Sequence, residues 1–251
     1  LSIRSSIPSF TVGFSNTSAT DEREHARAVA AAVGAEHVEV DFTEQDFWET
    51  LPNIARVMDD PVADYAVLPT YKLAAVAGQE LKVILCGEGG DELFGGYGRY
   101  RSMMRPWWKY KRAMRSRGAL EGLEVARMEN RDWRKGVATY ESVAGGVGRT
   151  SLQIAQAMDC TDWLAHDLLI KLDRCLMAHG VEGRTPLLDS AVTGAAFRLP
   201  DQLKVRGRIG KWILRKWLLK MLPEAKPFSA CLLYTSDAAD DTPCVDLGGR
   251  R

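Results

Sequence analysis

The sequence predicts an α/β fold, with a parallel β-sheet that carries helices on its faces. The first observation is that strand-like and helix-like segments alternate in short order over residues 9–58, which favours parallel strands joined by crossover helices. The second is the continuous apolar run VILC at residues 83–86, which is typical of a strand buried on both faces. The third is the Gly-rich, acidic loop GEGGDE at residues 87–92, because open α/β sheets bind ligands beyond the carboxyl ends of their strands.

Local patterns define the elements of the first half of the chain. Residues 9–14 (SFTVGF) alternate in polarity and predict a strand, and residues 37–41 (HVEVD) predict the next one. An Ala-rich helix is expected between them, over about residues 21–32. Two further helices are expected over residues 43–58 and 69–78, the second of them opened by a proline and ended by a glycine.

The second half predicts helices with polar residues set into apolar patterns. Residues 164–189 place leucines at helical spacing, and Lys171 is one of the polar residues that interrupt them. We expect buried ion pairs in this segment among Asp173, Arg174, Glu182 and Arg184. Residues 207–222 predict a loop that enters a helix near Lys211, where the ammonium and the unpaired N–H groups of a helix start together favour an anion.

Residues 99–117 are strongly basic and contain tyrosine and tryptophan side chains. Taken alone, such a segment could bind single-stranded nucleic acid through phosphate contacts and base stacking. The alternative is a helix with a solvated basic face whose tryptophans pack inward. We favour the second interpretation and expect no nucleic-acid partner, because the 33 basic and 33 acidic residues of the chain cancel to a formal net charge of zero.

Composition places the chain among ordinary globular proteins. It has 251 residues, of which 46% are hydrophobic and 26% are charged. No apolar run approaches the length of a membrane span, and the N-terminal residues do not have the layout of a signal peptide. The five cysteines are scattered without CxxC spacing, which predicts neither a disulfide framework nor a zinc site. A reducing, cytoplasmic location is therefore expected.

Residues 231–251 show no helical or strand period and are expected not to belong to the natural protein. The codons TGT CTC TTA TAC ACA TCT GAC GCT GCC GAC spell residues 231–240, and TGT GTA GAT CTC GGT GGT CGC CGT spell residues 244–251. Both stretches match parts of one sequencing-library adapter. We therefore assign residues 1–230 to the protein domain and exclude the rest from fold reasoning. The alternative is a natural disordered tail.

Three segments resemble one protein family. VILCGEGGDELFGGY at residues 83–97 is similar to the SGEGxDExFGGY signature of the asparagine synthetase family, the glutamine-dependent amidotransferases. Residues 171–189 resemble the family segment KxDRxxMxxxxExRxPFLD, with Leu187 in place of phenylalanine, and residues 211–215 (KWILR) match the KxxLR part of the family segment GxxKxxLR. The resemblance extends from about Phe10 to Pro223. It implies a parallel, adenine-nucleotide-binding sheet of the PP-loop ATPase (HUP-like) type, truncated at its N-terminus, with a mostly helical C-terminal part.

The resemblance also implies a set of site residues. It assigns nucleotide binding to Val12, Cys86, Gly87, Gly89, Gly90 and Asp91. Cys86 stands where the family usually has serine, so its side chain lacks the hydroxyl group that would bind the nucleotide. Asp91 matches a ligand of Mg²⁺, Glu88 a residue of adenylate formation, and Lys211 a lysine that contacts phosphate and the developing negative charge. Asp60 and Asp64 are candidates for binding the amino group of the substrate, the alternative being solvated loop carboxylates.

The implied activity is the ATP- and Mg²⁺-dependent amidation of aspartate to asparagine through a β-aspartyl-adenylate, with glutamine or ammonia as nitrogen source. Two family components, an SGGxDS pyrophosphate loop and an N-terminal glutaminase domain, are not found in the chain. We therefore expect an internal fragment of a synthetase domain that makes no asparagine by itself. The alternatives are a related amidotransferase, or a β-lactam or macrolactam synthetase, acting on another carboxylate, and a non-catalytic ATP-binding scaffold.

Overall fold

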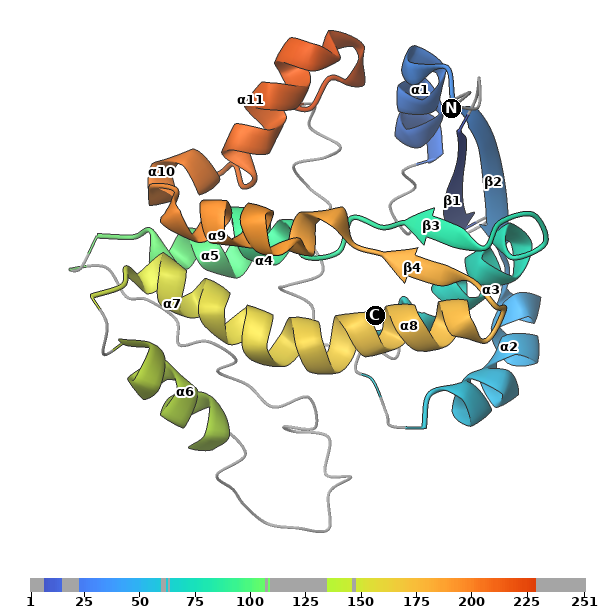
Figure 1. Ribbon diagram of the computed structural model, residues 1–251, viewed down its shortest axis with the longest axis horizontal. Helices are drawn as coiled ribbons and strands as arrows, with labels where there is room; N and C mark the ends of the chain where they lie inside the picture. Colours follow the sequence, from blue (N-terminus) through green and yellow to red (C-terminus); the bar gives the residue numbers. More distant parts are fainter. Residues whose placement is uncertain are drawn as a thin grey trace, which may run out of the picture.

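The structure, a computed structural model, describes residues 7–14, 23–59, 62, 64–106, 108, 135–145 and 148–228. The described residues form two small parallel sheets and a mostly helical C-terminal half, so the predicted α/β class and the helical C-terminal part are confirmed at this level (Figure 1). The candidate substrate residue Asp60, most of the basic segment 99–117 and the adapter-like residues 231–251 lie outside the described residues.

The first sheet contains β1 (Pro8–Phe14) and β2 (Glu36–Phe42), joined by α1 (Arg23–Val33). The two strands are parallel and pair residue for residue along their whole length. This strand–helix–strand order follows the pattern of the sequence. Next along the chain come α2 (Glu44–Val57) and α3 (Val67–Ala77), of which α3 contacts both strands. The core of this half contains Phe42, Ile54, Met58, Val67, Leu68 and Cys175.

The second sheet contains β3 (Val83–Leu85) paired in parallel with β4 (Glu182–Arg184). The sequence did not reveal β4, and among the described residues β3 is not hydrogen-bonded to β1, so the predicted single sheet is observed as two strand pairs. The prediction that β3 is buried on both faces is wrong. Val83 and Leu85 are 42% and 74% exposed, because helices cover only the face that carries Ile84.

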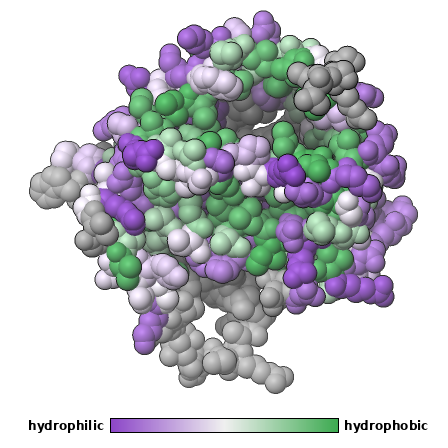
Figure 2. All heavy atoms as spheres, in the orientation of Figure 1, coloured by the Kyte–Doolittle hydropathy of each residue, from purple (hydrophilic) through white to green (hydrophobic). Residues whose placement is uncertain are grey.

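The remaining described elements are all helices or helical turns. Its elements are α4 (Gly90–Phe94), α5 (Gly98–Met103), α6 (Lys135–Gly145), α7 (Ser151–Met158), the π-helix η1 (Asp159–Leu168), α8 (Leu169–Met177), the 3₁₀ turn η2 (Pro186–Leu188), α9 (Ser190–Arg198), α10 (Asp201–Lys204), α11 (Trp212–Met221) and the 3₁₀ turn η3 (Pro223–Ala225). α7, η1 and α8 follow one another without a break and cross the molecule below β4 (Figure 1). Figure 2, drawn in the same orientation, shows hydrophobic residues at the surface of the face turned toward the reader and a hollow beneath α11.

The predicted buried ion pairs in residues 164–189 are not found, and that prediction is wrong. Arg174 pairs with Asp59 at 3.1 Å and Arg184 with Glu182 at 2.9 Å, but all four side chains are about half exposed or more. The reason is the period of α8, whose buried positions are 171, 172, 175 and 176, so that residues 173 and 174 fall on the solvent side. The buried cation of this segment is Lys171.

α2 begins with a capping box that gives a testable pH dependence. Thr43 Oγ1 accepts from the backbone N–H of Asp46, whose carboxylate accepts from the backbone N–H of Thr43 and lies 2.6 Å from Lys72 Nζ. The hydrogen bonds from Lys72 and Thr43 lower the pKa of Asp46 to about 2.

We expect Asp46→Ala to lower the free energy of unfolding by about 1 kcal/mol at neutral pH. The pKa of Asp46 is lower in the folded than in the unfolded chain, so this stabilisation is present above about pH 4 and is lost as the pH falls toward 2. Urea unfolding at a series of pH values measures it. Glu49→Gln, on the same helix, is the control and should change stability by less than about 0.5 kcal/mol. A difference that persists unchanged at pH 2 would contradict the assignment.

Candidate functional site

The loop after β3 is shaped by glycines around one very short helix. Gly89 and Gly95 flank α4 and both have left-handed backbone angles, with φ of 86° and 72°. Gly96 packs against the Asp91 side chain so closely that a Cβ atom would overlap the carboxylate. The chain therefore folds back over Asp91. The Asp91 side chain is 32% exposed, and its carboxylate lies at one edge of the loop.

Lys211 lies directly beside this carboxylate. Its Nζ is 2.8 Å from Asp91 Oδ1, and its backbone N–H donates to Phe94 O at 3.1 Å. As predicted, it stands at the start of a helix: it is the N-cap of α11, with a left-handed φ of 51°. Arg215, one turn into α11, turns inward and donates to the carbonyl oxygens of Gly210 and Pro227, so it supports the loop that carries Lys211.

Glu88 forms the second charged group of the site. Its Oε1 lies 3.6 Å from Lys171 Nζ, which pairs more closely with Asp64 Oδ2 at 2.6 Å. The Lys171 and Asp64 side chains are only 7% and 13% exposed, so the solvated-loop alternative does not hold for Asp64. Burial raises the pKa of Glu88 despite the opposing charge of Lys171. Burial by itself would lower the pKa of Lys171, but Asp64 and Glu88 outweigh it, so the pKa is raised and the ammonium is maintained.

Of the other nucleotide-binding candidates, Cys86 and Gly87 directly follow β3, whereas Val12 lies within β1. Cys86 continues the β3–β4 ladder, with its N–H donating to Arg184 O at 2.8 Å, and burial raises the pKa of its half-buried thiol. Gly87 is exposed, and a Cβ atom there would meet nothing within 4 Å. Val12 lies in β1, where its side chain packs against the core cluster of Phe42 and Ile54. The structure thus brings Glu88, Asp91 and Lys211 onto the loop edge and places Val12 on the other sheet.

Two of the groups that surround these residues were not found by sequence reasoning. Lys171 was noted only as a polar interruption, and its partner Asp64 lies 107 residues away in the chain. Gln156 and Lys204 are fully buried next to α4, yet nothing in the sequence of α7 or α10 distinguishes them from the other polar residues of these helices. The one available signal was the position of Gln156 between two alanines, Ala155 and Ala157. Such long-range pairings have no local sequence signature.

The donor set fits a magnesium–nucleotide complex better than an all-protein metal site. Within the described ranges, no group of three or more His, Cys, Asp or Glu side chains is placed to hold a metal ion. Mg²⁺ is commonly held by one or two carboxylates together with substrate phosphates and water. Asp91 offers one such carboxylate, with an ammonium group beside it for a phosphate.

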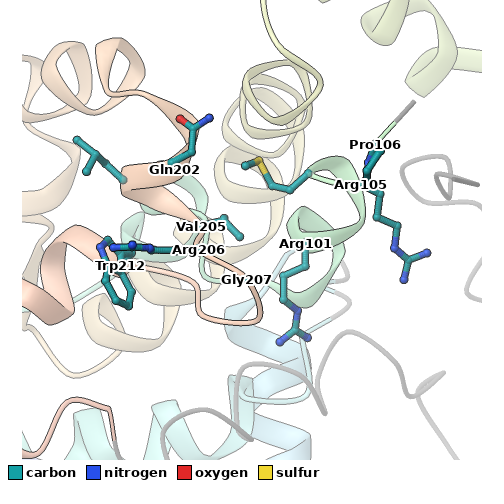
Figure 3. A pocket seen from close by; sticks show the side chains of 10 residues that line it. Arg101, Arg105, Pro106, Gln202, Val205, Arg206, Gly207 and Trp212 are labelled. Atoms are coloured by element: carbon teal, nitrogen blue, oxygen red, sulfur yellow. The ribbon is translucent and has the colours of Figure 1, made fainter. Parts of the chain in front are cut away.

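A separate cavity of about 630 Å³ lies between α5 and the segment leading into α11 (Figure 3). Its walls are Arg101, Met104, Arg105, Pro106, Gln202, Leu203, Val205, Arg206, Gly207 and Trp212. The guanidinium of Arg206 lies 4.8 Å from the Trp212 ring centroid, which fixes one wall. None of the predicted site residues lines this cavity, so it is distinct from the edge formed by Asp91 and Lys211.

Comparison with known proteins identifies the family. The family model for asparagine synthase matches residues 2–226. The chain belongs to the asparagine synthase family. "Putative asparagine synthetase (glutamine-hydrolyzing)" of Mycobacterium tuberculosis strain H37Rv is 32% identical over 252 residues, which cover 85% of this chain and 38% of that protein. "Asparagine synthetase (glutamine-hydrolyzing) 1" of Bacillus subtilis is 29% identical and covers 87% of this chain and 40% of its own length.

A third relative in the comparison has a different name. "Amidase chry2" of Gibberella zeae is 26% identical over 256 residues, which cover 80% of this chain and 38% of the amidase. The chain of the asparagine synthase family described here thus spans about two-fifths of the length of these relatives. Across the residues that the structure describes, no helix is both long and apolar enough to cross a membrane.

Proposed function

We propose that the protein carrying this chain is an ATP-dependent ligase that converts aspartate to asparagine. The observation that carries the proposal is the loop edge at which Asp91 and Lys211 lie 2.8 Å apart, with Glu88 on the same loop, in a chain that matches the asparagine synthase family. Glutamine, hydrolysed by a glutaminase domain elsewhere in the protein, is the proposed source of ammonia. The sheet is proposed to be of the PP-loop ATPase type.

The chemistry explains why charged groups are needed at this edge. A carboxylate is a poor acyl donor until one of its oxygens becomes a leaving group. In the proposed reaction the β-carboxylate of aspartate attacks the α-phosphate of ATP, giving β-aspartyl-adenylate and pyrophosphate. Ammonia then attacks the activated carbonyl, AMP leaves with the bonding electron pair, and the amide nitrogen releases a proton. Negative charge builds on phosphate oxygens, so preorganised cations lower the barrier.

Each candidate residue has a role that its surroundings support. Lys211 presents a partly exposed ammonium for phosphate, and Asp91 is the proposed carboxylate ligand of Mg²⁺, which would neutralise phosphate charge when bound. Glu88 is proposed to act in adenylate formation. Asp64, and Asp60 outside the described residues, remain proposed contacts of the substrate amino group. Main-chain groups of residues 86–90 and the side chain of Val12 are proposed to bind the nucleotide.

We expect Glu88→Gln in the full-length protein to lower kcat for aspartate-dependent pyrophosphate release at least about 10²-fold, because the variant removes one negative charge while keeping the side-chain shape. Glu182→Gln, an exposed change on β4, is the control and should leave the rate within about twofold. Pyrophosphate release and asparagine formation are measured in parallel with glutamine and with ammonia. An unchanged rate in Glu88→Gln would remove Glu88 from the mechanism.

A related ligase that activates another carboxylate is the second candidate, favoured by the similarity to the fungal amidase. The same pyrophosphate assay separates the two when aspartate is replaced by a panel of other amino-acid and peptide carboxylates. Release that depends on aspartate supports asparagine synthesis, and release that depends on another acid supports the alternative. ATP binding without release under any condition would leave the non-catalytic scaffold.

A further inference from the structure

The short helix α4 cannot satisfy its own carbonyl groups. In a helix of five residues the last four carbonyl oxygens lack intrahelical partners and must find donors elsewhere. The carbonyl of Asp91 accepts from the N–H of Gly96 at 2.9 Å, and that of Phe94 accepts from the N–H of Lys211 at 3.1 Å. The two carbonyls between them need a donor from outside these loops.

That donor is one buried side chain from α7. Gln156 Nε2 lies 2.6 Å from Glu92 O and 2.8 Å from Leu93 O, so both amide hydrogens are used. Its orientation is determined, because Lys204 Nζ lies 2.9 Å from Gln156 Oε1 and an ammonium can only donate. If the amide turned over, it would place N–H groups against the ammonium and an oxygen against two carbonyls. All of these contacts are buried, with Gln156 and Lys204 both 0% exposed.

Lys204 lies at the end of α10, shortly before the chain reaches Lys211. It is the last residue of α10, and its Nζ lies 5.7 Å from the Phe197 ring centroid. The next residue, Val205, packs against Gly95 at the end of α4, and the chain reaches Lys211 six positions later. Burial lowers the pKa of Lys204, and a buried ammonium is costly unless it is hydrogen-bonded. The contact with Gln156 therefore links the loop carrying Lys211 to the helix carrying Asp91.

We propose that Gln156, oriented by Lys204, is a positioning residue that fixes the end of α4 and so places the Asp91 carboxylate beside Lys211. The inference rests on the proposed function, since it concerns the placement of two residues assigned there to metal and phosphate. Positioning of this kind affects rate strongly, because a displacement of about 1 Å at a reacting group can cost on the order of 10²-fold.

Gln156→Glu is the decisive variant, because it keeps the shape of the side chain and an acceptor for Lys204 but removes both N–H donors. In the full-length protein we expect kcat for pyrophosphate release to fall about 10- to 100-fold and the affinity for Mn²⁺·ATP, measured by electron paramagnetic resonance, to weaken by about tenfold, with KM for aspartate within about twofold. Gln153→Glu is the matched control. It makes the same change about one turn earlier on α7, where it also removes a donor to a main-chain carbonyl, Phe197 O at 3.2 Å, but leaves the carbonyls of α4 satisfied. Glutamate at position 153 can keep the capping box with Thr150.

A second measurement does not depend on activity. Hydrogen exchange of the Gln156 side-chain amide, followed by nuclear magnetic resonance, should be slow in the wild type and at least about tenfold faster in Lys204→Met, where the amide is no longer oriented. Normal kcat and Mn²⁺·ATP affinity in folded Gln156→Glu would overturn the proposal, as would fast amide exchange in the wild type. If the wild type neither binds Mn²⁺·ATP nor releases pyrophosphate, the proposed function fails, and the amide exchange then decides this inference by itself.

Discussion

Replacing Lys211 with methionine in the full-length protein is expected to lower kcat for aspartate-dependent pyrophosphate release by about 10²- to 10³-fold, the usual cost of removing one preorganised charge-stabilising group. The ammonium lies 2.8 Å from Asp91, and both side chains are about one-third exposed, so a phosphate can reach it. Methionine keeps the length of the side chain and the backbone hydrogen bond to Phe94. Since neither residue is glycine, the left-handed backbone at φ 51° is equally strained in both proteins.

The control for this experiment is Lys220→Met. Lys220 lies at the exposed end of the same helix, α11, and its replacement should change kcat by less than about twofold. Rates are measured at saturating ATP and aspartate on protein whose fold has been verified by circular dichroism. If Lys211→Met retained more than about one-tenth of the wild-type rate, the assignment of Lys211 to charge stabilisation would be wrong.

Lys171→Met is expected to have the largest effect on stability, lowering the free energy of unfolding by about 3–5 kcal/mol. The variant removes the cation from a buried ion pair with Asp64, whose Oδ2 lies 2.6 Å away, and takes away the countercharge of Glu88 at 3.6 Å. Two carboxylates would then share a poorly solvated site without a positive charge. Chemical denaturation at neutral pH measures the loss.

Two further variants separate the ion pair from simple packing. Lys171→Met combined with Asp64→Leu should recover most of the lost stability, because it removes the uncompensated charge as well. Arg174→Met is the surface control, since its contact with Asp59 is about half exposed, and it should cost less than about 1 kcal/mol. A loss below about 1 kcal/mol in Lys171→Met alone would show that the pair with Asp64 is not buried in solution.

The first half of the fold was predictable because its signals are local. Alternating residues 9–14 and 37–41 form β1 and β2, and the expected helix over residues 43–58 is α2 with its cap at Thr43. The helix expected after Pro69 begins two residues earlier, at Val67, and ends before Gly78 as predicted. Periodicity and capping depend on neighbours within about one turn, so the sequence alone holds the information needed to predict these elements.

The second sheet was not predictable in the same way. β4 has only three residues, two of them charged, and it is recognisable as a strand only because it pairs with β3 about a hundred positions earlier. The apolar run at residues 83–86 predicted the strand itself but could not show how many of its faces are covered. Burial of a strand is a property of what packs against it, and the sequence of the strand does not contain that information.

The residues of the candidate site show the same difference between local and long-range signals. One contiguous motif identified Glu88 and Asp91 as candidates, and a second motif identified Lys211. The contact between Lys211 and Asp91 is visible only in the structure. Lys171 and Gln156 were missed because the hydrogen-bond partners that define each of them lie 48 or more residues away in the chain. The error on the ion pairs has the same origin, since a one-residue shift around α8 decides whether a charge is buried or solvated.

The exposed face of β3 has a consequence for handling the isolated chain. In the described part of the molecule the strand is hydrogen-bonded on one edge only, and Leu85 on its open face is 74% exposed. A strand with a free edge and apolar side chains is a template for adding another extended segment, including one from a second copy. We therefore expect concentrated solutions of this polypeptide to favour edge-to-edge aggregation, and Leu85→Lys to oppose it.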